Sequence, residues 1–467
     1  MYCNFTPAVG NPVAQTYASY TYTPNGQVAT LKDAKNNLTS YQYDGHERKV
    51  TTLYPSKTAV NTSSSTDTEQ YAFDNNANLI SFTKRSGQVI NFAYDNLNRL
   101  LTRSYTNSSE NVNFSYDLLG RRTQVIGATG ADTVAYVFDN AGRLTNTTSA
   151  GRTLSYQYDG AGNRTRITWP DATPFFVSTS FDALNRPIAL QENGSLNLAS
   201  YQYDDLSRRT LITLGNGTST GYTYSPQGTL AGLAHDLAGA AQDINYAYTR
   251  NQAQEIIQNT WNNDLYQWTG TTKPNATTSY SANGLNHYTA VTGIGQSSAP
   301  PSHDANGNLT AASHWTYSYD SDNRLKTAIS TDLATPVNAS LTYDAQGRLR
   351  QTQISVGGVN KQSQLLYDGV DLVAEYDTTT QAIQRRYVHG PGVDEPLVWY
   401  EGGGTSAKNW LRTGSVATIW AASSPRPTPA VPAARSTLTG RLESQPKPRP
   451  TTTALATPGS SSSKGWG

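Results

Sequence analysis

The chain of 467 residues is poor in charge: Lys, Arg, Asp and Glu make up 15% of it, and the formal net charge is +1. About 25% is typical, so the polarity here comes from hydroxyl and amide side chains. The 35 basic and 34 acidic residues form no basic stripe, which argues against nucleic-acid binding. We find no run of about 18 apolar residues to span a membrane, and we expect no signal peptide in the first residues.

The aromatic content favours β-structure. Tyrosine occurs 30 times and phenylalanine 9 times, beside 37 glycines. Tyr and Thr suit a half-buried pleated surface, and Asn and Gly suit turns, so we expect an all-β protein. Cys3 is the single cysteine, which excludes intramolecular disulfides and a cysteine-built zinc site.

After an N-terminal lead-in of residues 1–19, an internal repeat covers residues 20–380. The unit is an aromatic residue, any residue, a second aromatic residue and an aspartate, and it returns about every 22 residues. Between residues 205 and 303 the register continues at Tyr222 and Tyr246 without the acid. The aspartates of the copies are Asp44, Asp74, Asp95, Asp117, Asp139, Asp159, Asp182, Asp204, Asp304, Asp320, Asp344 and Asp368.

The residues after each aspartate predict a hairpin turn. Asn or Gly usually follows three residues later and Arg four later. We expect the Asp to open a type I turn and accept backbone N–H groups, the Asn or Gly to take the left-handed position, and the Arg to begin the return strand beside the Asp. Because the pair recurs along the chain, we interpret it as structural and not as catalytic or metal-binding. The residues of this structural repeat motif are Tyr43, Asp44, Arg48, Tyr94, Asp95, Arg99, Tyr116, Asp117, Arg121, Phe138, Asp139, Arg143, Tyr158, Asp159, Tyr203, Asp204, Arg208, Tyr319, Asp320, Arg324, Tyr343, Asp344 and Arg348.

One hairpin cannot bury its own face, so the hairpins must form a ribbon that twists and covers one face against its neighbours. We therefore expect a repetitive antiparallel β-hairpin ribbon that coils into a partial hollow β-shell. A short helix is expected near Leu230 to Ile257, where Ala-rich sequence interrupts the hairpins.

A more specific pattern follows the repeats. The stretch Arg385–Val398, here called the core motif, reads Arg-Arg-Tyr-Val-His-Gly-Pro-Gly-Val-Asp-Glu-Pro-Leu-Val, and Leu366–Tyr376 precedes it. With the tyrosine–aspartate repeats in register before it, the chain resembles an RHS/YD-repeat protein, and the core motif resembles the start of the RHS repeat-associated core domain. The residues of the core motif that we single out are Arg386, Tyr387, His389, Gly390, Pro391, Gly392 and Asp394.

The resemblance implies a hollow shell of coiled β-ribbon. In bacterial members the core domain closes one end, and a variable C-terminal toxin, often released by proteolysis within the core, lies inside. The same kind of shell serves cell-surface adhesion in other relatives, and the repeats have been credited with carbohydrate binding.

The sequence departs from the family after Trp410. We assign residues 381–412 to a truncated start of the core domain and residues 413–467 to a Pro-, Ser-, Thr- and Ala-rich tail that we expect to be disordered. Residues 421–467 carry a net charge of +5, against −4 for the first 420 residues. Two interpretations stay open: a shift of reading frame between Trp410 and Ala421, or a natural linker. The sequence of the underlying DNA distinguishes them.

We find no catalytic, cofactor or metal site and expect no enzyme activity. Gly217 to Gly221 matches Gly-x-Ser-x-Gly, but it lies between two repeat strands, where a turn is favoured over a hydrolase elbow. The six histidines show no close pairing of the metal-site kind.

Two functions fit the sequence. The first is the structural shell of an RHS-type polymorphic toxin, whose partner is a C-terminal toxin cargo that this chain lacks. The alternative is an extracellular carbohydrate-binding or cell-surface adhesion module, whose partner is a cell-surface carbohydrate. By resemblance, both place the protein outside a bacterium, secreted or associated with the cell surface.

Overall fold

The computed structural model describes residues 2–5, 13–266, 277–293, 300–330, 335–406 and 408–410. The chain divides into two units, Met1–Val416 and Ala417–Gly467, and the second unit lies outside the described residues. The expectations of a disordered tail and of a shifted reading frame concern the same undescribed stretch. In the described part the protein is all-β, which confirms the predicted fold class. No helix there is long and apolar enough to cross a membrane.

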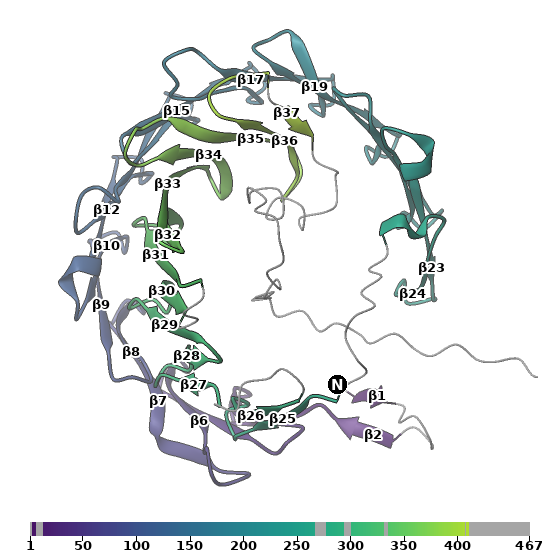
Figure 1. The fold of residues 1–467 in the computed structure, drawn as a ribbon. Coiled ribbons are helices and arrows are strands. Elements are labelled where there is room, and N and C mark those ends of the chain that lie inside the picture. Colours follow the sequence, from purple (N-terminus) through teal and green to yellow (C-terminus); the bar gives the residue numbers. More distant parts are fainter. Residues whose placement is uncertain are drawn as a thin grey trace, which may run out of the picture. The chain divides into compact units, whose positions relative to one another are not determined.

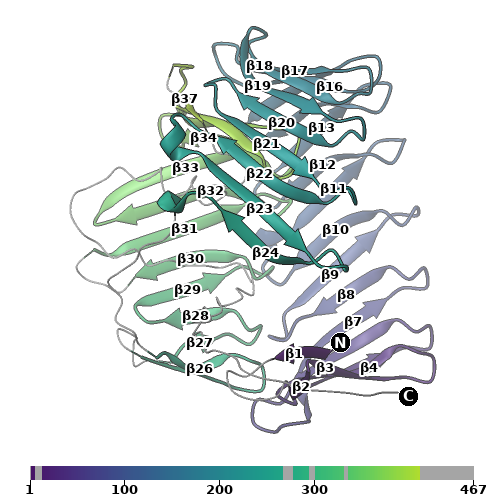
Figure 2. The same cartoon turned by 90° about the vertical axis from the view of Figure 1, so that its right-hand side faces the viewer.

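The first large sheet follows the repeats. Its strands pair antiparallel with their neighbours in chain order from β3 to β24. Figure 2 shows this stacking in chain order. The strands are β3 (Ala18–Tyr22), β4 (Val28–Asp33), β5 (Leu38–Tyr43), β6 (Lys49–Pro55), β7 (Ser63–Phe73), β8 (Leu79–Thr83), β9 (Val89–Tyr94), β10 (Leu100–Tyr105), β11 (Val112–Tyr116), β12 (Arg122–Gly127), β13 (Val134–Phe138), β14 (Leu144–Ser149), β15 (Arg152–Tyr158), β16 (Arg164–Thr168), β17 (Phe176–Phe181), β18 (Pro187–Glu192), β19 (Leu196–Tyr203), β20 (Arg209–Leu214), β21 (Ser219–Tyr224), β22 (Leu230–Asp236), β23 (Ile244–Arg250) and β24 (Ile256–Trp261).

A second large sheet is built by the later part of the chain, and it too is antiparallel and in chain order. Two separate hairpins accompany the large sheets, β1 (Tyr2–Phe5) with β2 (Val13–Thr16) and β25 (Ser279–Ala282) with β26 (Tyr288–Thr292). The strands of the second large sheet are β27 (Ser302–His303), β28 (Leu309–Ala312), β29 (Trp315–Tyr319), β30 (Leu325–Ser330), β31 (Val337–Tyr343), β32 (Leu349–Val356), β33 (Val359–Asp368), β34 (Asp371–Asp377), β35 (Ile383–His389), β36 (Pro396–Glu401) and β37 (Lys408–Trp410).

The helix expected near Leu230 to Ile257 is wrong. The segment forms β22, β23 and the start of β24, and its helical content is the single 3₁₀ turn η2 (Ala240–Gln242). The other 3₁₀ turns of the described chain are η1 (Ser108–Glu110) and η3 (Asp264–Tyr266). Alternation of Tyr246 and Tyr248 with small residues suits a strand, and backbone pairing with both neighbouring strands outweighs the modest helix propensity of a few alanines.

The second sheet packs against the first as an inner layer (Figure 1). Hydrogen bonds connect residues of the two layers that are more than 200 positions apart in sequence. In one of them the Trp169 indole donates to the Val373 carbonyl oxygen at 3.0 Å. One apolar cluster fills the space between β15–β20 and β33–β36, and it includes Leu154, Leu198 and Leu397, which are fully buried. Burying apolar area between two sheets supplies the stability that a single ribbon lacks.

Candidate functional site at the seam of the two sheets

The turn after Phe138 shows how each repeat is closed. Asp139 accepts the Arg143 backbone N–H on Oδ1 at 2.8 Å and the Arg143 Nε–H on Oδ2 at 2.7 Å. Gly142 takes the left-handed conformation with φ 83°. The backbone and side-chain hydrogen bonds from Arg143 hold the pKa of the Asp139 carboxyl below its usual value. Both carboxylate contacts come from Arg143, four residues later, so the four-residue spacing specifies this part of the turn.

The same geometry confirms the predicted turn chemistry at the other Asp–Arg copies. Asp159 differs, because Asn163 replaces the arginine and its amide donates to Asp159 Oδ2 at 2.9 Å. The carboxylates paired with the arginine four residues later are Asp44, Asp95, Asp117, Asp139, Asp182, Asp204, Asp320 and Asp344.

Each arginine also reaches into the next repeat. The Arg99 guanidinium lies 4.8 Å from the centre of the Tyr116 ring, and its Nη1 donates to the Asp117 carbonyl oxygen at 3.4 Å. Cation–π contact of this kind contributes about 0.5–1 kcal/mol where exposed. The same stacking occurs for Arg48 on Phe73, Arg121 on Phe138, Arg143 on Tyr158, Arg186 on Tyr203, Arg208 on Tyr224, Arg324 on Tyr343 and Arg348 on Tyr367.

The hydroxyl of the second aromatic residue explains why tyrosine outnumbers phenylalanine. Tyr116 donates to the Leu100 carbonyl oxygen at 2.9 Å, one residue after the arginine that stacks on its ring. Phenylalanine, as at Phe138, keeps the stacking and loses this bond. The other hydroxyls that donate back to the preceding hairpin belong to Tyr43, Tyr94, Tyr158, Tyr203, Tyr224, Tyr319 and Tyr343.

The core motif begins on β35 and is anchored by Arg386. This side chain is 1% exposed and pairs with Asp171, which lies between β16 and β17 of the first sheet. Its guanidinium stacks at 3.7 Å from the centre of the Phe175 ring. A buried cation of this kind requires its partner, because leaving it unpaired costs about 3–5 kcal/mol. Arg386 was singled out from the sequence, whereas Asp171 was not. The only sequence feature that could have indicated Asp171 is that it is an acidic residue outside the repeat pattern.

The rest of the core motif forms the end of β35 and a tight loop. Tyr387 is buried and its hydroxyl donates to Glu375, while the Gly390 N–H donates to the Glu395 carbonyl oxygen at 2.8 Å. A β-carbon at Gly390 would lie 2.6 Å from the Glu395 carboxylate, so a larger residue here would require the Glu395 side chain to move. The Gly392 N–H donates to Glu395 Oε2 at 2.8 Å. Pro391 lies between these two glycines, and Asp394 has a φ of 50°.

Two further polar links cross the same seam. Glu192, at the end of β18, accepts the Tyr400 hydroxyl at 2.6 Å and lies 3.2 Å from the Lys408 ammonium. Burial, followed by the hydrogen bond to Glu192, raises the pKa of Tyr400 well above its usual value. Arg209 pairs with Glu395 across the layers. None of these five residues was identified from the sequence as functional.

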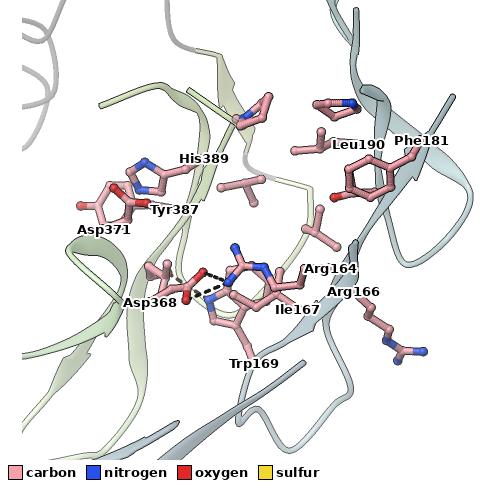
Figure 3. Close-up of a pocket in the computed structure, with 17 residues that line it drawn as sticks. Arg164, Arg166, Ile167, Trp169, Phe181, Leu190, Asp368, Asp371, Tyr387 and His389 are labelled. Atoms are coloured by element: carbon pink, nitrogen blue, oxygen red, sulfur yellow. Dashed lines mark hydrogen bonds and ion pairs between the residues drawn. The ribbon is translucent and has the colours of Figure 1, made fainter. Parts of the chain in front are cut away.

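A cavity of about 250 Å³ lies between β16–β18 of the first sheet and β34–β35 of the second (Figure 3). Among the described residues, no cluster of three or more His, Cys, Asp or Glu side chains is placed to hold a metal ion. The cavity is lined by Arg164, Arg166, Ile167, Trp169, Val177, Thr179, Phe181, Pro187, Leu190, Asp368, Asp371, Val373, Tyr387, Val388, His389, Gly390 and Pro391.

Comparison with known proteins agrees with the repeat geometry. A family model described as RHS repeat matches residues 136–173, which include the Asp139 turn and the Asp159 turn. No curated protein sequence matches the chain. The chain therefore contains an RHS repeat at residues 136–173, in agreement with the resemblance that its tyrosine–aspartate pattern indicated.

Solved structures similar to the chain come from toxin complexes. They include the crystal structures of TcdB2–TccC3 (13% identity, TM-score 0.49) and TcdB2–TccC3–Cdc42 (12%, 0.46). The Tc holotoxin pore of Photorhabdus luminescens is a further match (13%, 0.30). The alignments cover 86%, 86% and 84% of this chain, and each spans 27% of the other chain.

Proposed function

We propose that the protein is a wall segment of a toxin-associated RHS shell, with a mechanical and not a catalytic role. In this proposal the shell encloses a C-terminal toxin domain, and the protein acts outside a bacterial cell. The observation that carries it is the two-layered wall, in which the core motif is tied into the repeats by Arg386 and Asp171. A shell that retains cargo needs such ties, because single hairpins of a ribbon open independently of distant ones.

The links between repeats support the same role. The Asp–Arg pairs, the stacked rings and the tyrosine hydroxyls engage one another, so their polar atoms are committed to the wall and not to a substrate. The links also recur with little change from one repeat to the next. Such repetition favours a structural role along the whole sheet over a single binding or catalytic site.

Protection of a fused reporter tests the proposal. An unstructured, protease-sensitive peptide is attached after Gly467, and its cleavage is followed against the same peptide on an unrelated β-protein. If the chain encloses the reporter, cleavage of the reporter should be at least about tenfold slower on this chain than on the unrelated β-protein. Arg386→Met, which removes the tie to Asp171, should speed cleavage while the circular dichroism of the repeats is retained. Equal cleavage of the reporter on both carriers would exclude enclosure by this chain.

Exposed aromatic residues favour a second candidate, carbohydrate binding. Tyr20 and Tyr22 lie on one face of β3 and are 49% and 62% exposed, and Tyr17 precedes them at 60%. Aromatic rings on an open strand face can stack on sugars, since each ring presents a large apolar area beside a polar hydroxyl. A glycan array probed with the wild-type chain and with a Tyr20→Ser/Tyr22→Ser variant tests this. Binding to a defined glycan that the double variant loses would support it, and an empty array would reject it.

A further inference from the structure

The cavity between the two layers has an apolar body. Ile167, Val177 and Leu190 face it from the first sheet, and Val373 and Val388 from the second. Its volume of about 250 Å³ exceeds the roughly 150 Å³ that holds a benzene molecule in an engineered protein cavity. A six-membered ring, or an aliphatic chain of four carbons, fits with one short polar arm.

The hydrogen-bond donors at the cavity are largely engaged by the protein itself. The Trp169 indole donates to the Val373 carbonyl oxygen at 3.0 Å, and Arg164 donates to Asp368 at 3.0 Å. The Tyr387 hydroxyl donates to Glu375. The Arg166 guanidinium stacks on Phe176 at 3.4 Å and points away from the cavity in Figure 3.

His389 lines the cavity and holds a buried acceptor atom. Its Nε2 lies 2.8 Å from the Leu372 carbonyl oxygen, which can only accept, so this nitrogen carries the proton. In the neutral ring Nδ1 then holds a lone pair, and this atom is buried with no hydrogen-bond partner among the described residues. A buried acceptor left without a donor costs free energy that a ligand donor would recover.

Asp371 supplies the second acceptor. It lines the same cavity from the first position of β34, and no ion pair or side-chain hydrogen bond within the described chain engages its carboxylate. The neighbouring Asp368 is matched by Arg164 at 2.8 Å, so Asp371 is the carboxylate whose charge is not offset by a close cation. An anionic ligand would face this charge and the His389 lone pair, whereas a cation would be attracted by both.

We propose that this cavity binds a small organic cation, an ammonium group on a short apolar stem, with Asp371 and His389 accepting its N–H groups. The stem lies against the apolar walls formed by Ile167, Val177, Leu190, Val373 and Val388. The inference does not depend on the shell role, since it concerns a ligand site inside the wall. The ammonium could belong to a free amine or to a lysine side chain of a peptide, and the two sources need separate probes.

Titration of the full chain with matched probes tests the site. Benzylamine represents the free amine, and N-acetyl-lysine methylamide represents the peptide. Benzyl alcohol and phenylacetate are controls of similar shape that are neutral and anionic, respectively. Isothermal titration calorimetry and saturation-transfer NMR should give a Kd on the order of 1 mM for at least one of the two cations. Binding of benzylamine alone would identify a small amine as the ligand, and binding of the lysine derivative alone would identify a peptide.

Variants decide whether binding occurs at this cavity. Asp371→Asn keeps the shape and should weaken cation binding at least about tenfold, while Asp205→Asn, at an exposed turn position, should leave it unchanged. Val388→Phe fills the cavity and should abolish binding, with near-ultraviolet circular dichroism reporting that the seam is intact. Absence of binding by both cations, binding of phenylacetate as tight as benzylamine, or equal effects of Asp371→Asn and Asp205→Asn would each overturn the proposal.

Discussion

The Tyr400 hydroxyl donates a 2.6 Å hydrogen bond to Glu192 Oε2, joining two buried side chains that are 208 positions apart in sequence. The Lys408 ammonium lies 3.2 Å from the same oxygen, so the buried carboxylate keeps two partners. Burial of a carboxylate is tolerated only when it is paired and hydrogen-bonded in this way. The link therefore specifies where β36 lies on β18.

Replacing Tyr400 by Phe should lower the free energy of unfolding by about 1.5–3 kcal/mol, the range for a hydrogen bond to a charged group. The ring remains packed on Phe175, so the loss reports the hydroxyl alone. Urea unfolding followed by circular dichroism measures it. Tyr22→Phe, at a ring that is 62% exposed, is the control and should shift stability by less than about 0.5 kcal/mol. Equal effects of the two substitutions would contradict a structural role for the Tyr400–Glu192 bond.

The turns could be predicted from the sequence because their chemistry is local. Asp139, Gly142 and Arg143 lie within five positions, and their backbone and side-chain contacts follow from that spacing. The links from one repeat to the next were only partly predictable. The placement of the tyrosines on a half-buried strand surface was expected, whereas the donation from Tyr116 to the Leu100 carbonyl depends on the register between hairpins.

The seam could not be predicted because its partners are distant in sequence. Asp171 and Arg386 are 215 positions apart, and neither the hairpin spacing nor the hydrophobic pattern indicates that they meet. The sequence also predicted one continuous ribbon, whereas the described strands form two large sheets packed as layers. That layering depends on apolar burial between the sheets, a property of the folded whole and not of a 22-residue unit.

Glycine at the left-handed position of a turn should be costly to replace. Gly142→Ala should destabilise by about 1–2 kcal/mol, because φ there is 83° and a β-carbon is strained in that region. Gly160→Ala, in the next turn, is the control: its φ is not in this region and its β-carbon would meet open space. There alanine should be neutral or slightly stabilising, by about 0.4–1 kcal/mol. Urea midpoints of the two variants measure the difference, and matching midpoints would show that the turn geometry is not as described.

Acid should weaken the repeats through their turn carboxylates. Hydrogen bonds from the following arginine hold the pKa of Asp44, Asp139 and Asp204 below the usual value. A carboxyl with a lowered folded pKa adds stability above its unfolded pKa of about 3.9, and this stability is lost as pH falls through the folded pKa. Urea midpoints should therefore be flat from pH 7 to pH 5 and drop below about pH 4. Asp139→Asn should reduce the size of that drop, and a drop of undiminished size would assign acid sensitivity to other groups.

The contact between the β25–β26 hairpin and β27 should loosen as pH falls from 7.5 to 5, before the turn carboxylates are protonated. The rings of His287 and His303 stack with centres 4.2 Å apart. Burial lowers the pKa of both histidines. The charges on His303, Arg85 and Lys57 lower the pKa of His287 further, and the charge on Asp67 raises it. The charge on Asp304 raises the pKa of His303. A histidine with a lowered folded pKa adds stability that is complete above its unfolded pKa of about 6.5 and is lost as pH falls through the folded value.

Hydrogen exchange of the amides of residues 279–292, corrected for the intrinsic effect of pH, should therefore show less protection at pH 5 than at pH 7.5. His303→Tyr places the residue that most other repeats have before the aspartate and removes one of the two charges. We expect it to abolish most of the pH dependence, because a single protonated imidazole no longer faces a second one. His46→Tyr, at an exposed turn position, should leave the dependence unchanged. If the hairpin loses protection equally in wild type and His303→Tyr, the stacked pair is not the cause.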